Sequence, residues 1–290
     1  MADNVVGLLC INLMNFSVIT SVYRNDKPDY VRVALESMLV KQSVKPTEII
    51  MVIDGPVPEG IDALISDFEV GYPNIFRVIR LPQNKGLGNA LRLGVENASF
   101  DTIARMDSDD ICLPDRFEKQ LAFMESNPEV DIVGGQMTEF IGEPENIIGI
   151  RNVPLDNADI YKFMRGRCGL NHVTVMFKKA SVIKAGNYQD WYWNEDYYLW
   201  VRMMALGCLF ANIPDVLVNV RSGSEQYARR GGRQYFESNK GIQDLLLDNK
   251  LTTTRDYCIN IAKYFIVQRM LPNFIRGWVY RVFARKRNVS

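Results

Sequence analysis

Short apolar runs alternate with helical patterns along the first half of the chain. Runs rich in β-branched and aliphatic residues at 16–23, 48–53, 76–81 and 102–106 predict strands. Between them, apolar residues recur every three or four positions, as on one face of a helix: Val31, Leu35, Met38 and Leu39, then Ile61, Leu64, Ile65 and Phe68, then Leu91 and Val95. This alternation is typical of βαβ units, so we expect an α/β fold whose mostly parallel sheet is flanked by helices.

The second half of the chain mixes helices and strands. Its pattern predicts helices at 114–124 and 197–206 and strands at 130–134 and 171–177. Three arginines and two glycines at 229–233 indicate a mobile basic loop, and the residues that follow are again helical. No apolar run approaches the length that a bilayer-spanning helix needs.

Composition narrows the class of protein. With 290 residues, 47% hydrophobic and 23% charged, the chain can bury a substantial core and is ordinary for a globular protein. The five cysteines are widely spaced without a C-x-x-C pair, which argues against a disulfide scaffold or zinc site and indicates the cytoplasm. The single histidine, His172, excludes a histidine-rich metal site, so carboxylates are the expected acid–base groups.

An acidic cluster follows the strand expected at 102–106. Asp107, Asp109 and Asp110 lie within four positions, and such carboxylates repel one another unless a cation lies among them. A divalent metal that carries a diphosphate would satisfy them, and ligands in open α/β sheets bind at the carboxyl ends of strands. The alternative is a solvated turn, in which aspartate and serine are ordinary.

Four further segments accompany this cluster in a fixed order: Phe16–Asp26, Glu48–Gly55, Asn84–Ala90 and Asn194–Trp200. Together with the D-x-D of the acidic cluster, they resemble the family 2 glycosyltransferases of the GT-A fold. That group includes enzymes of bacterial exopolysaccharide, capsule and O-antigen synthesis. The resemblance covers most of the chain and implies a Rossmann-like sheet.

The resemblance also implies a domain organisation. Residues 14–225 would form the GT-A domain, with a nucleotide-sugar-binding half at 14–115 and an acceptor half at 116–225. Residues 226–290 would form a basic helical C-terminal segment.

Six residues are expected to bind the nucleotide-sugar: Tyr23, Asp54, Asn84, Gly86 and the two aspartates of the D-x-D, Asp107 and Asp109. Tyr23 ends the first strand, where its ring would stack on uracil, as aromatic rings do with bases; otherwise it is a half-buried aromatic residue. Asp54 resembles the family's strand-two aspartate, which accepts a hydrogen bond from the base. The turn that holds Asn84 and Gly86 opens a helix and offers N–H groups to phosphate, but as a bare glycine motif it favours a simple turn over direct contact.

The D-x-D is expected to hold the metal. By resemblance, Asp107 lies near the ribose and metal-bound water, while Asp109 contacts the metal. Mn²⁺ or Mg²⁺ suits such an oxygen-rich site with substrate phosphates. Asp110 either helps or caps the next element.

The pair Glu195-Asp196 is expected to act on the acceptor. In the matching family motif the aspartate, here Asp196, is the general base that deprotonates the acceptor hydroxyl in a single, inverting displacement. Without the resemblance, the pair would only be favourable charge at a helix start. Trp193, Glu195 and His172 are expected to border the acceptor, but a hydrogen-bonded structural role for His172 is an equal alternative.

The implied function is metal-dependent transfer from a UDP-sugar to a hydroxyl of a lipid-linked saccharide. One alternative is a sugar-1-phosphate nucleotidyltransferase, which needs a glycine-rich loop after the first strand; residues 23–28 contain no glycine. The other alternative is a non-catalytic, sugar-binding descendant of a transferase.

The tail suggests a further partner. From Tyr257 onward there is no acidic residue, and seven lysines and arginines leave the rest of this neutral chain at −7. Apolar residues recur there at helical spacing: Leu271, Phe274, Ile275, Trp278, Val279 and Val282. Such a helix suits the anionic inner-membrane surface, where the protein would be peripheral on the cytoplasmic face. The alternative interpretation is that this helix packs on the catalytic domain. Nucleic-acid binding is not expected, because the remainder is acidic and no RNA motif occurs.

Overall fold

The computed structural model describes residues 14–223 and 231–271. Nine strands form one sheet in the order β3-β2-β1-β4-β8-β6-β9-β5, with β7 beside β6. The strands are β1 Phe16–Val22, β2 Glu48–Ile53, β3 Phe76–Arg80, β4 Thr102–Arg105, β5 Ile111–Cys112, β6 Ile132–Phe140, β7 Ile147–Arg151, β8 Met176–Lys178 and β9 Phe210–Arg221. The helices are α1 Pro28–Leu39, α2 Glu59–Gly71, α3 Leu87–Asn97, α4 Arg116–Ser126, α5 Asn157–Met164, α6 Lys179–Lys184, α7 Glu195–Ala205, α9 Arg233–Asp248 and α10 Thr254–Tyr264.

The first four strands form the parallel sheet that the sequence predicts. β1 pairs in parallel with both β2 and β4, and β2 pairs in parallel with β3. Beyond β4 the sheet is mixed: β8 runs antiparallel to β4 and β6, whereas β9 runs parallel to β6. The α/β class and the flanking helices are therefore confirmed, with the parallel portion confined mainly to the N-terminal half.

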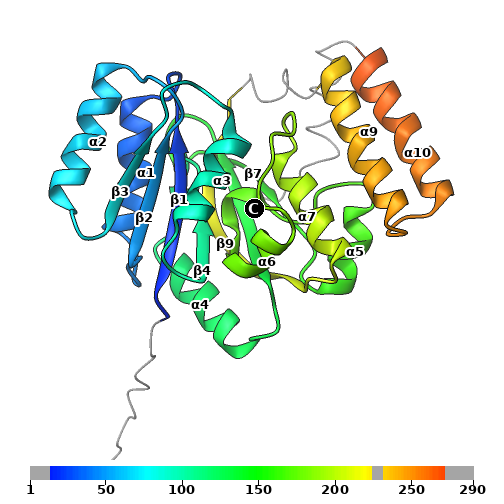
Figure 1. Ribbon diagram of the computed structural model, residues 1–290, viewed down its shortest axis with the longest axis horizontal. Coiled ribbons are helices and arrows are strands. Elements are labelled where there is room, and N and C mark those ends of the chain that lie inside the picture. The colour runs from blue at the N-terminus through cyan, green and yellow to red at the C-terminus, as the bar shows by residue number, and fades with distance from the viewer. Residues whose placement is uncertain (1–13, 224–230, 272–290) are drawn as a thin grey trace, which may run out of the picture.

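Alternate residues of the strands face two separate cores, as the period of a pleated strand requires. In β1, Val18 packs with α1, α2 and α4, while Ile19 packs with α3 and α7 on the other face. Ile49 and Ile50 of β2 divide in the same way. The molecule thus has three layers, and Figure 1 shows α1 and α2 at one side and the α9–α10 pair at the opposite side.

One expected strand is wrong. Residues 171–177 form a 3-10 turn at His172–Thr174 before the short strand β8. The Thr174 hydroxyl donates to the Asn171 carbonyl, and the Asn171 amide donates to the Gly135 carbonyl. Such side-chain bonds to nearby backbone compete with a strand ladder, which explains the turn.

Other elements were not predicted. They include the short helices α5 and α6 and three strands of the second half, β5, β7 and β9. The basic loop expected at 229–233 falls partly outside the described residues, and its last residue, Arg233, begins α9.

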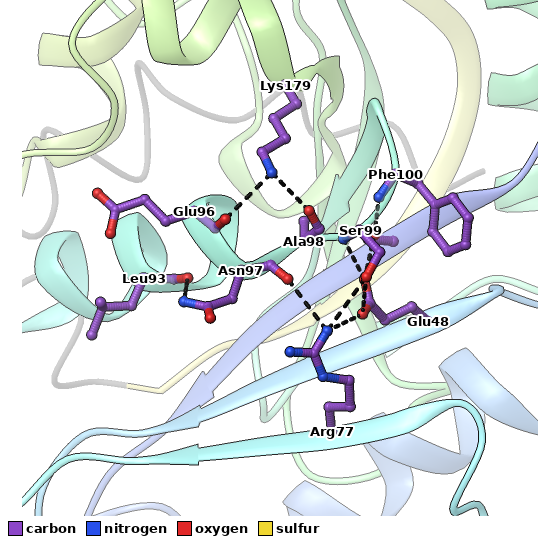
Figure 2. Close-up of polar contacts among 10 residues, drawn as sticks. Glu48, Arg77, Leu93, Glu96, Asn97, Ala98, Ser99, Phe100 and Lys179 are labelled. Carbon is purple, nitrogen blue, oxygen red and sulfur yellow. Dashed lines mark hydrogen bonds and ion pairs between the residues drawn. The ribbon is translucent and has the colours of Figure 1, made fainter.

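The buried side chain of Glu48 connects the parallel strands at their amino-terminal ends. Glu48, the first residue of β2, accepts a hydrogen bond from the Ser17 hydroxyl at 2.7 Å. It also accepts from the Ser99 N–H and hydroxyl at 2.8 Å (Figure 2). Arg77 of β3 completes the group with an ion pair of 2.5 Å. These bonds join β1, β2, β3 and the segment that leads into β4.

The C-terminal helices lie against the domain. Tyr257 of α10 donates to Asp244 of α9 at 2.8 Å. Asn260 and Tyr264 of α10 donate to the carbonyls of Arg165 and Gly166 at 2.8 and 2.9 Å. A π-helical turn, Phe265–Met270, continues α10. Among the residues that the structure describes, no helix is long and apolar enough to cross a membrane. The expected apolar stripe falls largely on 272–290, outside those residues.

Candidate active site

The acidic cluster lies at the carboxyl end of β4, as expected. The pairing of β4 with β1 continues one residue past the strand, where the Met106 N–H donates to the Ile19 carbonyl at 3.1 Å. From the opposite side, the Arg105 N–H donates to the Val175 carbonyl at 3.0 Å. The chain therefore leaves the sheet at a fixed point, and Asp107 to Asp110 follow directly.

Asp107 forms an ion pair with a buried arginine. Both terminal nitrogens of Arg105 contact the two Asp107 oxygens, one of them at 2.8 Å. Only 2% of the Arg105 side chain is exposed. Burial lowers the pKa of Arg105, but the charge of Asp107 and smaller contributions from Tyr188 and Glu195 more than reverse this. Arg105 is thus a fixed positive charge beneath the acidic cluster.

Asp109 and Asp110 differ in their surroundings. Burial and the charges of Asp107 and Asp26 raise the pKa of Asp109. Asp110 is almost fully buried and accepts a hydrogen bond from the Arg221 N–H at 2.8 Å, so it holds the end of β9 to the cluster. Of the two roles expected for Asp110, the geometry favours the structural one.

The donor set fits a hard divalent cation. Burial and, after it, the charges of Asp107 and Asp26 raise the pKa of Asp109, and a bound cation would offset both effects. Within the described ranges, no three His, Cys, Asp or Glu side chains form a complete cage. Mg²⁺ and Mn²⁺ sites that use one or two carboxylates together with substrate phosphates need no such cage.

Asp54 organises the turn that precedes α3. Its carboxylate accepts from the N–H groups of Lys85 at 2.7 Å and Gly86 at 2.9 Å, and its carbonyl accepts from the Asn84 amide at 3.1 Å. Gly55 has φ of 86°, and a Cβ there would lie 2.5 Å from the Asn84 nitrogen, so only glycine permits this approach. Two N–H groups of this turn, those of Lys85 and Gly86, are therefore engaged by Asp54, which favours the simple-turn interpretation.

Tyr23 lies half-buried immediately after β1, near the acidic cluster. Its N–H donates to Asp26 at 2.9 Å, and the Ser108 hydroxyl donates to the same Asp26 oxygen at 3.2 Å. Burial, together with the Asp107 charge, raises the pKa of Asp26 to about 6. These contacts hold the turn after β1 beside the turn after β4.

Glu195 and Asp196 begin α7, as expected. Burial raises the pKa of Asp196, while the Tyr197 N–H and the charges of Arg151 and Arg105 oppose the rise. Burial and the charge of Asp196 raise the pKa of Glu195. The Arg105 charge acts on both carboxylates as well as on Asp107, so the two acidic segments share one buried cation.

The residues expected to border the acceptor have different environments. His172 Nε2 lies 2.9 Å from the Tyr188 hydroxyl, and burial together with the Arg105 charge holds the pKa of His172 well below its usual range. Its hydrogen-bonded structural role is thus supported. Trp193 is half exposed and has φ of 55°, an uncommon conformation for a bulky residue and one that clusters at functional sites. Trp200 is fully buried.

Two neighbours of these carboxylates were missed. The Cys168 thiol lies 3.9 Å from an Asp196 oxygen, and burial and the Asp196 charge raise the pKa of Cys168 to about 12. Nothing in the sequence pairs these residues. Arg105 is the second of these neighbours, and its position two residues before Asp107 was the available signal.

Comparisons with known proteins identify the family of this chain. Residues 17–190 match the model of Glycosyl transferase family 2. The chain is 39% identical to amylovoran biosynthesis glycosyltransferase AmsE of Erwinia amylovora, over 91% of this chain and 97% of that protein. It is 36% identical to UDP-Gal:alpha-D-GlcNAc-diphosphoundecaprenol beta-1,3-galactosyltransferase of Escherichia coli, over 93% of this chain and 97% of that protein.

The fold also matches a solved structure. Residues 1–349 of S. aureus TarS, solved in complex with UDP-GlcNAc, give a TM-score of 0.64 at 15% identity, over 92% of this chain and 79% of that one. The family match and the relatives named as glycosyltransferases favour a glycosyltransferase over a nucleotidyltransferase or a non-catalytic descendant. The chain belongs to glycosyltransferase family 2 and is a glycosyltransferase of the GT-A fold.

Proposed function

We propose that this enzyme transfers a sugar from a UDP-sugar to a hydroxyl of a lipid-linked saccharide, with inversion, during synthesis of a bacterial cell-surface polysaccharide. The observation that carries the proposal is the shared buried cation: Arg105 binds Asp107 on the donor side and acts electrostatically on Asp196 on the acceptor side. The leaving diphosphate and the attacking hydroxyl must lie on opposite sides of one anomeric carbon. With Asp107 bound to Arg105 and Asp196 within reach of its charge, one carboxylate would face the diphosphate and the other the hydroxyl.

The donor would bind between the turns that follow β1, β2 and β4. Tyr23 would stack on the uracil and Asp54 would accept from the base, since a carboxylate that already accepts two N–H bonds keeps further lone pairs. Asp109, with Asp107 beside it, would hold Mn²⁺ or Mg²⁺. The bound metal would stabilise the charge that develops on the leaving diphosphate.

Asp196 would act as the general base. It would accept the proton of the acceptor hydroxyl as that oxygen attacks the anomeric carbon opposite the UDP. Burial raises its pKa above the ordinary value of an aspartate, which strengthens it as a base, while the Tyr197 N–H and the charges of Arg151 and Arg105 oppose the rise. An α-linked donor would give a β-linked product, and the beta linkage in the name of the Escherichia coli relative is consistent with this.

The acceptor would approach from the side of Trp193. The half-exposed indole directly precedes Glu195, and aromatic faces suit the apolar faces of sugars. Support for a lipid-linked saccharide comes from the same relative, whose named substrate is a diphosphoundecaprenol-linked GlcNAc. The relative AmsE is named for amylovoran biosynthesis, which supports the polysaccharide context.

A lipid-linked acceptor would bring the enzyme to the cytoplasmic face of the membrane. Phe265, Ile266 and Met270 after α10 are about half exposed or more, and Lys263 and Arg269 lie among them. The acid-free segment after them carries five further cations. This combination of exposed apolar and basic side chains supports peripheral attachment to anionic lipid.

A donor screen tests the proposal. Purified enzyme is incubated with UDP-, GDP- and dTDP-sugars, a synthetic GlcNAc-diphosphate that bears an alkyl chain, and either Mn²⁺ or chelator. We expect transfer from a UDP-sugar with Mn²⁺ and none with chelator. Transfer only from GDP- or dTDP-sugars, or full activity in chelator, would contradict the donor or the metal assignment.

A further inference from the structure

The segment that leads into Glu195 lies between the donor side and α9. On the donor side it packs against the start of α3: a Cβ on Gly88 would lie 2.5 Å from the Gln189 carbonyl oxygen. On the other side it contacts α9, more than forty residues later in the sequence. The position of this segment is therefore set by two distant parts of the chain.

Ser238 of α9 holds the segment through three hydrogen bonds. Its hydroxyl donates to the Tyr192 carbonyl at 2.8 Å and accepts from the Asn194 amide at 2.9 Å. Its carbonyl accepts from the Trp191 indole N–H at 3.0 Å. Ser238 is 7% exposed, so water competes little for these bonds.

The Asn194 side chain does not cap the helix that follows it. Asn194 precedes the first residue of α7, where an asparagine side chain ordinarily accepts from the first turn of its own helix. Here the side chain makes no capping bond and reaches across to Ser238 instead. The helix that begins with Glu195 and Asp196 is thus anchored to α9 rather than capped locally.

Gly241, one turn further along α9, makes room for Trp191. The Trp191 ring stacks on Tyr198 of α7, with centroids 3.9 Å apart and planes at 9°. A Cβ on Gly241 would lie 2.6 Å from the Trp191 ring. Because that ring is held by Tyr198 and by Ser238, it has little freedom to move away.

We propose that α9 is a positioning element of the active site, in which Ser238 and Gly241 fix residues 191–194 and, through them, Asp196 and the exposed indole of Trp193. The inference rests on the proposed function. It gives the C-terminal segment a part in acceptor alignment, separate from any attachment to membrane. Ser238 and Gly241 touch neither substrate nor metal; they act through the segment they hold.

Two variants disturb this contact by different means. Ser238→Ala removes the hydroxyl, and Ser238→Thr restores it. Gly241→Ala raises helix propensity yet intrudes on Trp191. Matched controls are Glu237→Ala, on the exposed face of α9, and Gly71→Ala, at the end of α2, where an added methyl meets nothing within 4 Å.

Three measurements separate positioning from folding. Hydrogen exchange of residues 189–198 reports the contact itself, calorimetry with UDP and Mn²⁺ reports the donor site, and kcat and acceptor KM report transfer. We expect Ser238→Ala and Gly241→Ala to speed exchange, leave UDP affinity unchanged and lower kcat by about 10- to 100-fold, the loss that a small misplacement causes. Ser238→Thr and both controls should match the parent.

The outcomes are distinguishable. Faster exchange with unchanged kcat and KM would overturn the inference, because the contact would then not serve the reaction. Equal loss of UDP binding and turnover would also overturn it, since α9 would act through the whole fold. If the parent itself transfers no sugar, the proposed function fails, and that result is seen before any variant is compared.

Discussion

The Arg105 guanidinium and the Asp107 carboxylate, two residues apart at the end of β4, form a bidentate ion pair in which the arginine is buried. An arginine fork matches a carboxylate in this geometry, whereas a lysine offers a single point of charge. The pair fixes the first carboxylate of the D-x-D, and the remaining field of Arg105 reaches Glu195 and Asp196. Arg105 therefore links the D-x-D electrostatically to Glu195 and Asp196, the two acidic segments that we propose serve the donor and the acceptor.

Replacing Arg105 by lysine should keep the charge but lose one of the two contacts. A hydrogen bond to a charged group is worth about 1.5–3 kcal/mol, so we expect kcat/KM to fall by about 10- to 100-fold. Steady-state kinetics check this, with Arg92→Lys as control, because the Arg92–Glu96 pair is exposed and long at 3.9 Å. Parent-like kinetics in Arg105→Lys would show that the fork is dispensable.

Asp109→Ala should abolish metal-dependent UDP binding without unfolding the protein. The raised pKa of Asp109 means that its charge is unfavourable in the metal-free fold, so its removal costs little stability. Calorimetry with UDP and Mn²⁺ measures binding, and thermal unfolding measures stability. The exposed Asp101→Ala serves as control. Binding equal to that of the parent would remove Asp109 from the metal site.

Asp196→Asn should leave UDP affinity intact and lower turnover by about 10²–10⁴-fold, the usual contribution of a general base. A base must be deprotonated, so activity should rise with pH through the pKa of Asp196, which burial raises above the ordinary 3.8. The acidic limb of the pH profile should therefore lie above that value and be absent from Asp196→Asn. Comparable losses of UDP binding and turnover would instead assign Asp196 to the nucleotide site.

Glu48→Gln should lower the free energy of unfolding by about 1–3 kcal/mol, because it weakens buried hydrogen bonds. Burial alone would raise the pKa of Glu48, but the bonds from Ser99, Ser17 and Arg77 outweigh it and lower the pKa. The contribution is thus complete above the unfolded value of about 4.5 and is lost as pH falls through the lower, folded value.

Urea unfolding at neutral and acidic pH tests this prediction. The gap between the parent and Glu48→Gln should narrow on acidification, and the exposed Glu59→Gln should show no gap at either pH. A gap that widens in acid would contradict the sign of the shift.

The tail should carry membrane attachment. We expect truncation after Leu271, which spares the bonds of Asn260 and Tyr264 to the domain, to weaken flotation with anionic vesicles strongly. The five basic residues removed would each gain about 1 kcal/mol near anionic lipid. Added salt should weaken attachment of the full chain, and neutral vesicles should not bind it. Equal flotation of both proteins would assign attachment elsewhere.

Local sequence patterns predicted the N-terminal half of the fold, where each strand is recognisable from its own residues. Strands β1 to β4 are short apolar runs that end in turn residues, and each pairs within the parallel block. In contrast, β9 contains a proline, Pro214, which argues against a strand, and it pairs with β6, about eighty residues earlier, so its formation depends on a distant partner. The turn at His172–Thr174 was read as a strand because its apolar residues hide the side-chain bonds that define it.

Those parts of the candidate site that are contiguous motifs could be predicted from the sequence. The acidic cluster and Glu195-Asp196 were recognisable because each is contiguous. The contacts that connect these motifs were not recognisable from the sequence. The role of Arg105 depends on its burial, and Ser238 bonds to Asn194, 44 positions earlier in the chain. Contacts of this kind depend on tertiary packing, which no local pattern encodes.

The stereochemistry of the product tests the central claim most directly. With an α-linked UDP-sugar, Mn²⁺ and a lipid-diphosphate saccharide, the proton NMR coupling of the newly linked anomeric position reports its configuration. The account predicts a β-linked product from the parent and a turnover lower by orders of magnitude from Asp196→Asn. An α-linked product, or a β-linked product formed as fast by Asp196→Asn, would contradict a single displacement that uses Asp196 as the base.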